Sequence, residues 1–222
     1  MTQGIFITGT DTGVGKTIVA CALLRAYVAQ GLRAIGMKPV AAGIAVGTAC
    51  NDDVAALDAA GNVAAPDSAR NPYAFVPAIA PHLAAREAGV APELARICAA
   101  YGELAAHADR IVVEGAGGAL VPLDRHLDML DVARALGLPV LLVVGLRLGC
   151  LNHALLSALA IRARGLALAG WAANPIDPAM ARLDANLATL DEHLPAPRIA
   201  TFRWGRPDAP EWSAAAAALD VR

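Results

Sequence analysis

Three consecutive residues near the amino terminus suit phosphate chemistry. Gly15-Lys16-Thr17 follows a short apolar run and a loop rich in glycine and threonine, within the sequence GIFITGTDTGVGKTIV at 4–19. Glycines let backbone N–H groups turn toward phosphate oxygens, and a helix start adds partial positive charge there. Lys16 could then contact the β- and γ-phosphates of a nucleotide, and the Thr17 hydroxyl could bind Mg²⁺. The stretch predicts a phosphate-binding P-loop. The alternative is an ordinary strand-to-helix turn.

Three charged residues stand at or near the ends of predicted strands. Lys38 closes one apolar run, Glu114 closes another before Gly-Ala-Gly-Gly, and Asp53 lies in an Asn-Asp-Asp sequence before a short helix. Lys38 could stabilise negative charge on a transferring phosphoryl group. Asp53 and Glu114 could join Thr17 around one Mg²⁺, which prefers oxygen ligands. Taken alone, Lys38 could be a solvated strand end and Asp53 a plain helix cap.

Further along the chain, two polar groups suit other parts of a nucleotide-dependent site. Asn174 follows a predicted strand, where its amide could bind an adenine base, but it could also be a turn residue before Pro175. Asn152 and His153 lie at the start of a helix predicted after Gly149. Unpaired N–H groups at that helix start could bind a carboxylate, or the two side chains could only cap the helix.

The elements that would position these residues alternate between strand and helix. Strands are predicted at residues 5–7, 33–38, 110–114, 139–144, 166–173 and 198–202. Helices are predicted at 16–30, 54–60, 93–108, 128–136, 148–164 and 178–193, and after residue 204. Loops are predicted at 40–50, at 115–118 and, with short helical turns, at 61–92; a stretch as long as the last is usually functional. The alternation predicts one α/β domain over residues 1–222, with a mostly parallel, doubly wound sheet and helices on both faces.

Composition and charge narrow the possible functions. The chain has 222 residues and a net charge of −2, without the broad basic surface that nucleic acids or membranes attract. No apolar run reaches the roughly 18 residues needed to cross a bilayer, and no signal-peptide pattern is visible. The four cysteines have no CxxC spacing and are expected to be free thiols. We therefore expect a cytoplasmic protein with no nucleic-acid or membrane partner.

The sequence resembles the dethiobiotin synthetase family over nearly its whole length. The resemblance implies ATP-dependent closure of a ureido ring on 7,8-diaminononanoate with CO₂, through a carbamate and a carbamic-phosphoric mixed anhydride, with ADP and phosphate released. Thr10, where the usual P-loop has glycine, is typical of that family. The segments that carry the resemblance are ITGTDTGVGKT at 7–17, KPVAAG at 38–43, NDD at 51–53, NPYAF at 71–75, APH at 80–82, VEGAGG at 113–118, LGCLNHALL at 148–156, AN at 173–174 and LPAP at 194–197.

The resemblance also implies roles for particular residues, a homodimer with its site at the interface, and use of Mg²⁺ and ATP. It implies catalytic roles for Lys16, Lys38 and Thr12, and metal binding by Thr17, Asp53 and Glu114. The implied nucleotide contacts are Gly13, Val14, Gly15, Lys16, Thr17, Ile18, Asp53, Glu114, Gly115, Ala116, Gly117, Asn174 and Pro175. The implied substrate contacts are Lys38, Ala42 and Gly118, with Cys150, Leu151, Asn152 and His153 at the interface.

Four positions depart from the pattern of that family. Ala42 stands where serine is usual, Arg147 where lysine is usual, and Pro175 where arginine is common. A tyrosine that helps bind the substrate tail in some members corresponds to Leu183. The nucleotide loop near residues 202–205 aligns poorly.

Two other functions fit the sequence less well. A cobyrinate amidase domain needs a glutamine-hydrolysing domain, for which the chain is too short. A ParA- or MinD-like positioning ATPase carries lysine at the position of Asp11, and the MinD type ends in an amphipathic membrane helix. Asp11 and the nearly uncharged, alanine-rich tail disfavour both the ParA and the MinD type of positioning ATPase. Phosphate release that needs diamine and bicarbonate, instead of DNA or lipid, would separate synthesis from positioning.

Overall fold

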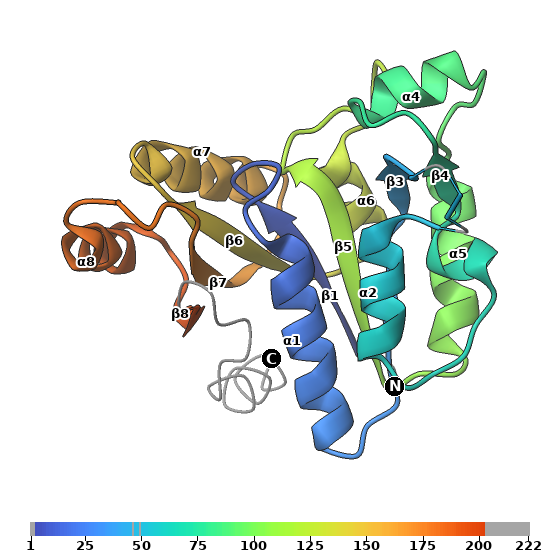
Figure 1. Ribbon diagram of the computed structural model, residues 1–222, viewed down its shortest axis with the longest axis horizontal. Coiled ribbons are helices and arrows are strands. Elements are labelled where there is room, and N and C mark those ends of the chain that lie inside the picture. The colour runs from blue at the N-terminus through green and yellow to red at the C-terminus, as the bar shows by residue number, and fades with distance from the viewer. Residues whose placement is uncertain (1–2, 46, 49, 203–222) are drawn as a thin grey trace.

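The structure, a computed structural model, describes residues 3–45, 47, 48 and 50–202. Within them, six strands form one sheet in the order β2-β5-β1-β6-β7-β8, and all neighbouring pairs are parallel (Figure 1). The predicted fold class, a single α/β domain with a doubly wound sheet, is confirmed. The helix predicted after residue 204 lies outside the described residues. The strands of this sheet are β1 (Gln3–Gly9), β2 (Ala34–Met37), β5 (Arg110–Gly118), β6 (Val140–Leu146), β7 (Leu168–Pro175) and β8 (Arg198–Thr201).

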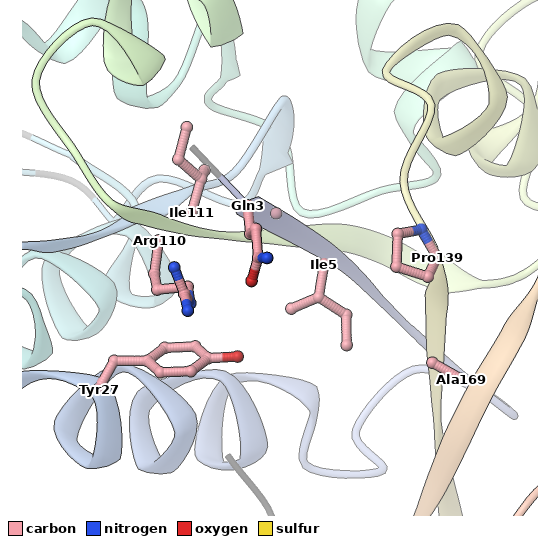
Figure 2. Close-up of a pocket in the computed structure, with 8 residues that line it drawn as sticks. Gln3, Ile5, Tyr27, Arg110, Ile111, Pro139 and Ala169 are labelled. Carbon is pink, nitrogen blue, oxygen red and sulfur yellow. The ribbon is translucent and has the colours of Figure 1, made fainter. Parts of the chain in front are cut away.

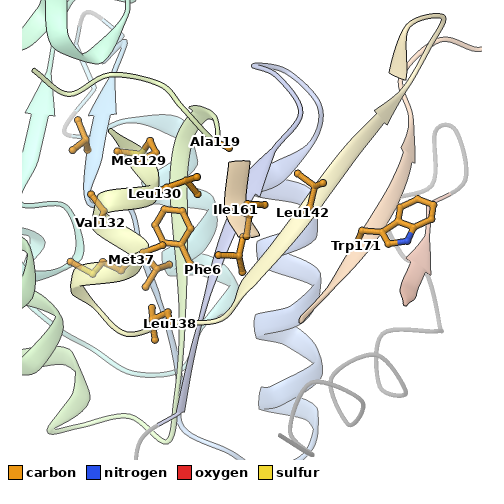
Figure 3. Close-up of a cluster of buried hydrophobic side chains, with 14 of the residues drawn as sticks. Phe6, Met37, Ala119, Met129, Leu130, Val132, Leu138, Leu142, Ile161 and Trp171 are labelled. Atoms are coloured by element: carbon orange, nitrogen blue, oxygen red, sulfur yellow. The ribbon is translucent and has the colours of Figure 1, made fainter. Parts of the chain in front are cut away.

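Helices cover both faces of the sheet because its strands are apolar on both sides. In β1, Ile5 and Ile7 pack with helices α1 (Lys16–Ala29) and α2 (Asp52–Ala60), while Phe6 between them joins the opposite core. Figure 3 shows Phe6 beside the side chains of α6 (Met129–Ala135). The opposite face is completed by α5 (Leu94–Ala105), α7 (Cys150–Ala163) and α8 (Leu183–His193). No helix in the described part of the chain is both long and apolar enough to cross a membrane.

A second, two-stranded parallel sheet was not predicted from the sequence. It pairs β3 (Val40–Ala42) with β4 (Tyr73–Phe75), in two stretches that were predicted as loops (Figure 1). Strands of three residues show too little alternation to be recognised, and these two pair across about thirty positions of sequence. The short helical turns expected between residues 61 and 92 are α3 (Asp67–Arg70) and α4 (Pro81–Glu87).

Several predicted boundaries were also wrong. The glycines at 115–118 continue β5, and Gly118 pairs with Gly9 after a register shift, so they are not a separate loop. The helix expected from residue 148 begins at Cys150, after Gly149 with a φ of 96°. The helix expected from residue 178 begins at Leu183. β7 runs on to Pro175, which places Asn174 inside the strand instead of after it.

Candidate active site

The glycine loop between β1 and α1 has the backbone geometry of a phosphate cradle. Gly13 and Gly15 have φ values of 74° and 91°, in the left-handed region that glycine adopts without strain. Thr10 anchors the loop: its N–H donates to the Val143 carbonyl over 2.9 Å and its hydroxyl accepts the N–H of Gly145 over 3.2 Å. A threonine at position 10 therefore fixes the loop to the end of β6, a contact that glycine could not make.

Two residues of this segment, Lys16 and Thr12, line a large cavity beside the loop. The Lys16 ammonium donates to the Asp11 carbonyl over 3.0 Å, and Lys16 is buried although it lines the cavity. Thr12 is exposed at the cavity wall, and its N–H donates to the Asp11 carboxylate over 2.7 Å. Burial, together with repulsion from Lys38, lowers the pKa of Lys16 to about 8. An anion bound in the loop would favour the charged form of Lys16.

Lys38, Asp53, Glu114 and Thr17 meet just past Met37 and Val113, where the pairing of β2 with β5 ends. The Lys38 Nζ lies 2.5 Å from Glu114 Oε1 and 2.6 Å from Asp53 Oδ2. The Thr17 hydroxyl lies 2.7 Å from Asp53 Oδ1 and 3.0 Å from Glu114 Oε1. Asp53 is not the cap of α2, because the cap is Asn51, whose side chain accepts the Asp53 N–H. The side chains predicted for phosphoryl and metal chemistry therefore come together.

Burial and pairing set the charges of this cluster. Burial alone would lower the pKa of Lys38, but Glu114 and Asp53 raise it above its usual value. Burial would raise the pKa of Asp53, but Lys38 lowers it below its usual value. Burial raises the pKa of Glu114, and Lys38 opposes that rise. Lys38 therefore favours the ionised form of both carboxylates, against the effect of burial.

The donor atoms fit a magnesium ion. Glu114 Oε2 is buried and has no hydrogen-bond partner among the described residues, so one lone-pair-bearing oxygen is available inside the cluster. No group of three or more His, Cys, Asp or Glu side chains in the described residues could hold a metal. The candidate ligands are thus two carboxylates and the Thr17 hydroxyl, and Mg²⁺ commonly completes such a shell with water and phosphate oxygens.

One cavity of about 760 Å³ lies over this cluster. It is lined by the predicted residues Thr12, Gly13, Gly15, Lys16, Thr17, Ile18, Lys38, Ala42, Asp53, Glu114, Ala116 and Gly117. It is also lined by Ala78, Ile79, Ala80, Pro81 and Val121, which were not predicted individually. The signals available for the first four were the APH sequence and the length of the irregular stretch that contains them. The cavity has the size of a typical ligand site.

The other predicted nucleotide and substrate residues do not line this cavity. Val14 is buried beneath the loop, and its carbonyl accepts the Asn174 amide over 2.8 Å. Asn174 therefore ties β7 to the phosphate loop here, and its contact with adenine, like that of Pro175, stays a prediction. Gly115 is packed against Phe6, and Gly118 pairs with Gly9.

The start of α7 lies apart from the cavity and carries an apolar surface. Cys150 is buried and Leu151 half-buried, whereas Asn152 and His153 are exposed. Leu148, just before α7, is 94% exposed, and three leucines of α7 are also exposed: Leu155, Leu156 and Leu159. Arg147, just before them, pairs with the phosphate loop through Asp11 over 2.7 Å.

A smaller cavity lies at the opposite ends of the strands. It has a volume of about 30 Å³ and is lined by residues of β1, β5 and α1, with Arg110 stacked over Tyr27 (Figure 2). A space of this size holds water and no organic ligand. The larger cavity is therefore the candidate reaction site, and the smaller one is a gap in the packing.

A strand, a glycine loop ending in Gly-Lys-Thr, a helix and an acid on the neighbouring parallel strand define a P-loop NTPase fold. Solved structures agree at the level of the fold. MinD of Pyrococcus horikoshii, complexed with Mg-ADP, has a TM-score of 0.58 at 16% identity, over 99% of this chain and 94% of that chain. FtsY of Thermotoga maritima has a TM-score of 0.52 at 17% identity, over 99% and 68%.

Sequence comparison identifies the family. The family model described as an AAA domain matches residues 3–207. The ATP-dependent dethiobiotin synthetase BioD of Nitrosospira multiformis is 54% identical over 89% of this chain and 86% of its own length. The protein of the same name in Pseudomonas aeruginosa is 53% identical over 98% and 96%. The chain belongs to the ATP-dependent dethiobiotin synthetase family.

Proposed function

We propose that this protein uses ATP to close the ureido ring of dethiobiotin from 7,8-diaminononanoate and CO₂, releasing ADP and phosphate. The relatives above are named for dethiobiotin synthesis, which supports the reaction class. The observation that carries the proposal is the single cavity that joins the phosphate loop to Lys38 and the apolar wall at 78–81. Such a cavity lets a γ-phosphate and an apolar diamine chain lie side by side.

The residues divide the reaction between them. One substrate amine adds to CO₂ and loses a proton to give a carbamate. The carbamate oxygen then attacks the γ-phosphorus of ATP while ADP leaves. The second amine attacks the carbonyl carbon, loses its proton and expels phosphate, which closes the ring. Lys16 and the loop N–H groups hold the phosphates, Thr12 lies beside them, and Lys38 stabilises the charge that builds up on the carbamate and the migrating phosphoryl group.

Mg²⁺, bound by Thr17, Asp53 and Glu114, would supply charge neutralisation at the β- and γ-phosphates. These three side chains would hold the ion with little rearrangement, since the Thr17 hydroxyl already contacts both carboxylates. A cytoplasmic location is part of the same proposal.

The reaction is tested by ADP formation with purified protein. We expect turnover only when ATP, Mg²⁺, 7,8-diaminononanoate and bicarbonate are all present, and dethiobiotin should accumulate in equal amount to ADP. Turnover that needs DNA or lipid vesicles in place of the diamine would instead support a positioning ATPase.

The protein is also proposed to act as a homodimer through α7. The exposed leucines of α7 form an apolar surface beside the helix start at 150–153, which would complete the site of the neighbouring subunit. The variant Leu156→Asp/Leu159→Asp should be a monomer by light scattering, with a raised KM for the diamine. Val90→Asp, an exposed apolar residue elsewhere, is the matched control and should stay dimeric. A wild-type monomer with full activity would contradict the dimer.

A further inference from the structure

Lys38 occupies the position between the two carboxylates proposed to bind the metal. Its ammonium contacts Asp53 over 2.6 Å and Glu114 over 2.5 Å, and the Lys38 side chain is only 6% exposed. A lysine proposed to act on the substrate is thus held, in this structure, by the metal ligands. We infer that Lys38 is an internal counter-cation of the metal site, which Mg²⁺ displaces on binding, so that metal loading releases the ammonium toward the substrate.

The charges of the cluster support competition between the two cations. Lys16 and Lys38 balance Asp53 and Glu114, and the Thr17 hydroxyl adds no charge. Adding Mg²⁺ to this balanced, largely buried group would leave two uncompensated positive charges, which is unfavourable in a site shielded from water. Nucleotide phosphates would compensate them. Mg²⁺ alone should therefore bind weakly, and binding with nucleotide should drive Lys38 off the carboxylates.

The backbone allows only the side chain of Lys38 to move. Its N–H donates to the Arg70 carbonyl over 2.8 Å, and its carbonyl accepts the Asn71 side-chain amide over 2.6 Å. The main chain is therefore fixed on both sides of the residue. The four-carbon stem can still rotate, since Lys38 lines the cavity.

A released ammonium would find no other protein anion in the cavity. Of the described residues that line it, the carboxylates are Asp53 and Glu114, both of which are then metal ligands. Much of the remaining lining consists of small or apolar residues, among them Ala42 and Ile79. The ammonium must pair with ligand charge, and under the proposed function, on which this step depends, that charge is the carbamate and the γ-phosphate.

Calorimetric titration with Mg²⁺ alone, without nucleotide, tests the competition. Lys38→Met should bind Mg²⁺ at least about tenfold more tightly than wild type, because a unit charge beside the ions is removed. Lys38→Arg, which keeps the competing charge, should show no gain. Lys16→Met is the matched control, since that ammonium contacts the Asp11 carbonyl and no carboxylate, and its gain should be smaller. Equal affinity of wild type and Lys38→Met would overturn the inference.

Cross-linking of the wild-type protein provides a second test if Lys38→Met does not fold. A zero-length carbodiimide reagent should join Lys38 to Asp53, whose side chain is 40% exposed, in the protein alone and with ADP. Mg²⁺ with ADP should abolish that cross-link in mass spectra. A cross-link that persists at saturating Mg²⁺-ADP would show that Lys38 stays on the carboxylates. Neither experiment uses turnover, so failure of the diamine assay would leave the result on the metal site unaffected.

Discussion

One ion pair lies just beyond each end of the stretch in which β2 pairs with β5, and the two ion pairs differ in exposure and surroundings. At the amino ends, Arg33 and Asp109 meet over 2.8 Å with side chains 60% and 35% exposed. Where the pairing of β2 with β5 ends, Lys38 and Glu114 meet over 2.5 Å with side chains 6% and 1% exposed. The first pair is exposed to solvent, and the second is almost fully buried.

This difference in exposure distinguishes a structural ion pair on the surface from an ion pair in a reactive site. The Arg33 guanidinium and its backbone N–H both donate to the Asp109 carboxylate, which fastens two strand ends where solvent already screens the charges. The buried pair requires two ions to lose their hydration, which seldom increases stability over apolar residues. A buried Lys38–Glu114 pair over a cavity of 760 Å³ is therefore better explained by chemistry than by stability.

The largest expected effect is on kcat, which should respond to loss of Lys38 but not to loss of Arg33. Lys38→Met keeps the bulk of the stem and removes the charge, so we expect kcat to fall by at least about 10²-fold, as for loss of one preorganised donor. ATP affinity should change far less, because Lys16 and the loop hold the phosphates. Arg33→Met at the other end should leave kcat unchanged. The measurement is kcat and ATP affinity for both variants.

Arginine at position 38 tests the same prediction more finely. Lys38→Arg should rescue turnover only in part, because the planar guanidinium is larger than a compact ammonium. If Lys38→Met turned over within about tenfold of wild type, the effect would be well short of the expected 10²-fold loss. Lys38 would then be a structural lysine, and the two ion pairs would not differ in function.

The charged residues at the carboxyl edge of the sheet could be predicted from the sequence, whereas several residues of the cavity wall could not. Lys38 and Glu114 both end apolar runs, and because parallel strands end at a shared edge, their meeting followed from pattern alone. The contact of Lys38 with both carboxylates did not follow, since side-chain rotamers depend on tertiary packing. Ala78–Pro81 and Val121 could not be assigned individually, because small apolar residues carry no chemical signal. The place of Ala78–Pro81 also depends on the short β3–β4 pairing that precedes them.

The next effect concerns the free energy of unfolding. Glu114→Gln keeps the side-chain shape but leaves Lys38 with Asp53 alone, and we expect a loss of about 2–3 kcal/mol, somewhat below the usual cost of breaking a buried pair. Combining it with Lys38→Met should recover part of the loss, because no ammonium then lacks a partner. Urea denaturation of the single and double variants measures both.

Asp109→Asn is the matched control at the solvent-exposed end, and its loss should be much smaller. If Glu114→Gln and Asp109→Asn lost the same stability, burial would not distinguish the two pairs, and the interpretation of the carboxyl edge as an electrostatically costly site would be wrong.

The smallest effect is a pH dependence at the amino edge. Hydrogen bonds from the Arg33 side chain and backbone lower the pKa of Asp109 from 3.8 to about 2. Because the folded state favours the carboxylate, the pair stabilises the fold fully above the unfolded pKa, and its contribution disappears as pH falls from 3.8 toward about 2. The difference in urea midpoint between wild type and Asp109→Asn should therefore be constant from pH 7 to 5 and shrink below pH 4, the region of an unperturbed aspartate. The difference in urea midpoint could instead stay constant down to the lowest pH at which both proteins fold. Arg33 would then contribute no charge-dependent stability, and the Arg33–Asp109 pair would act through packing alone.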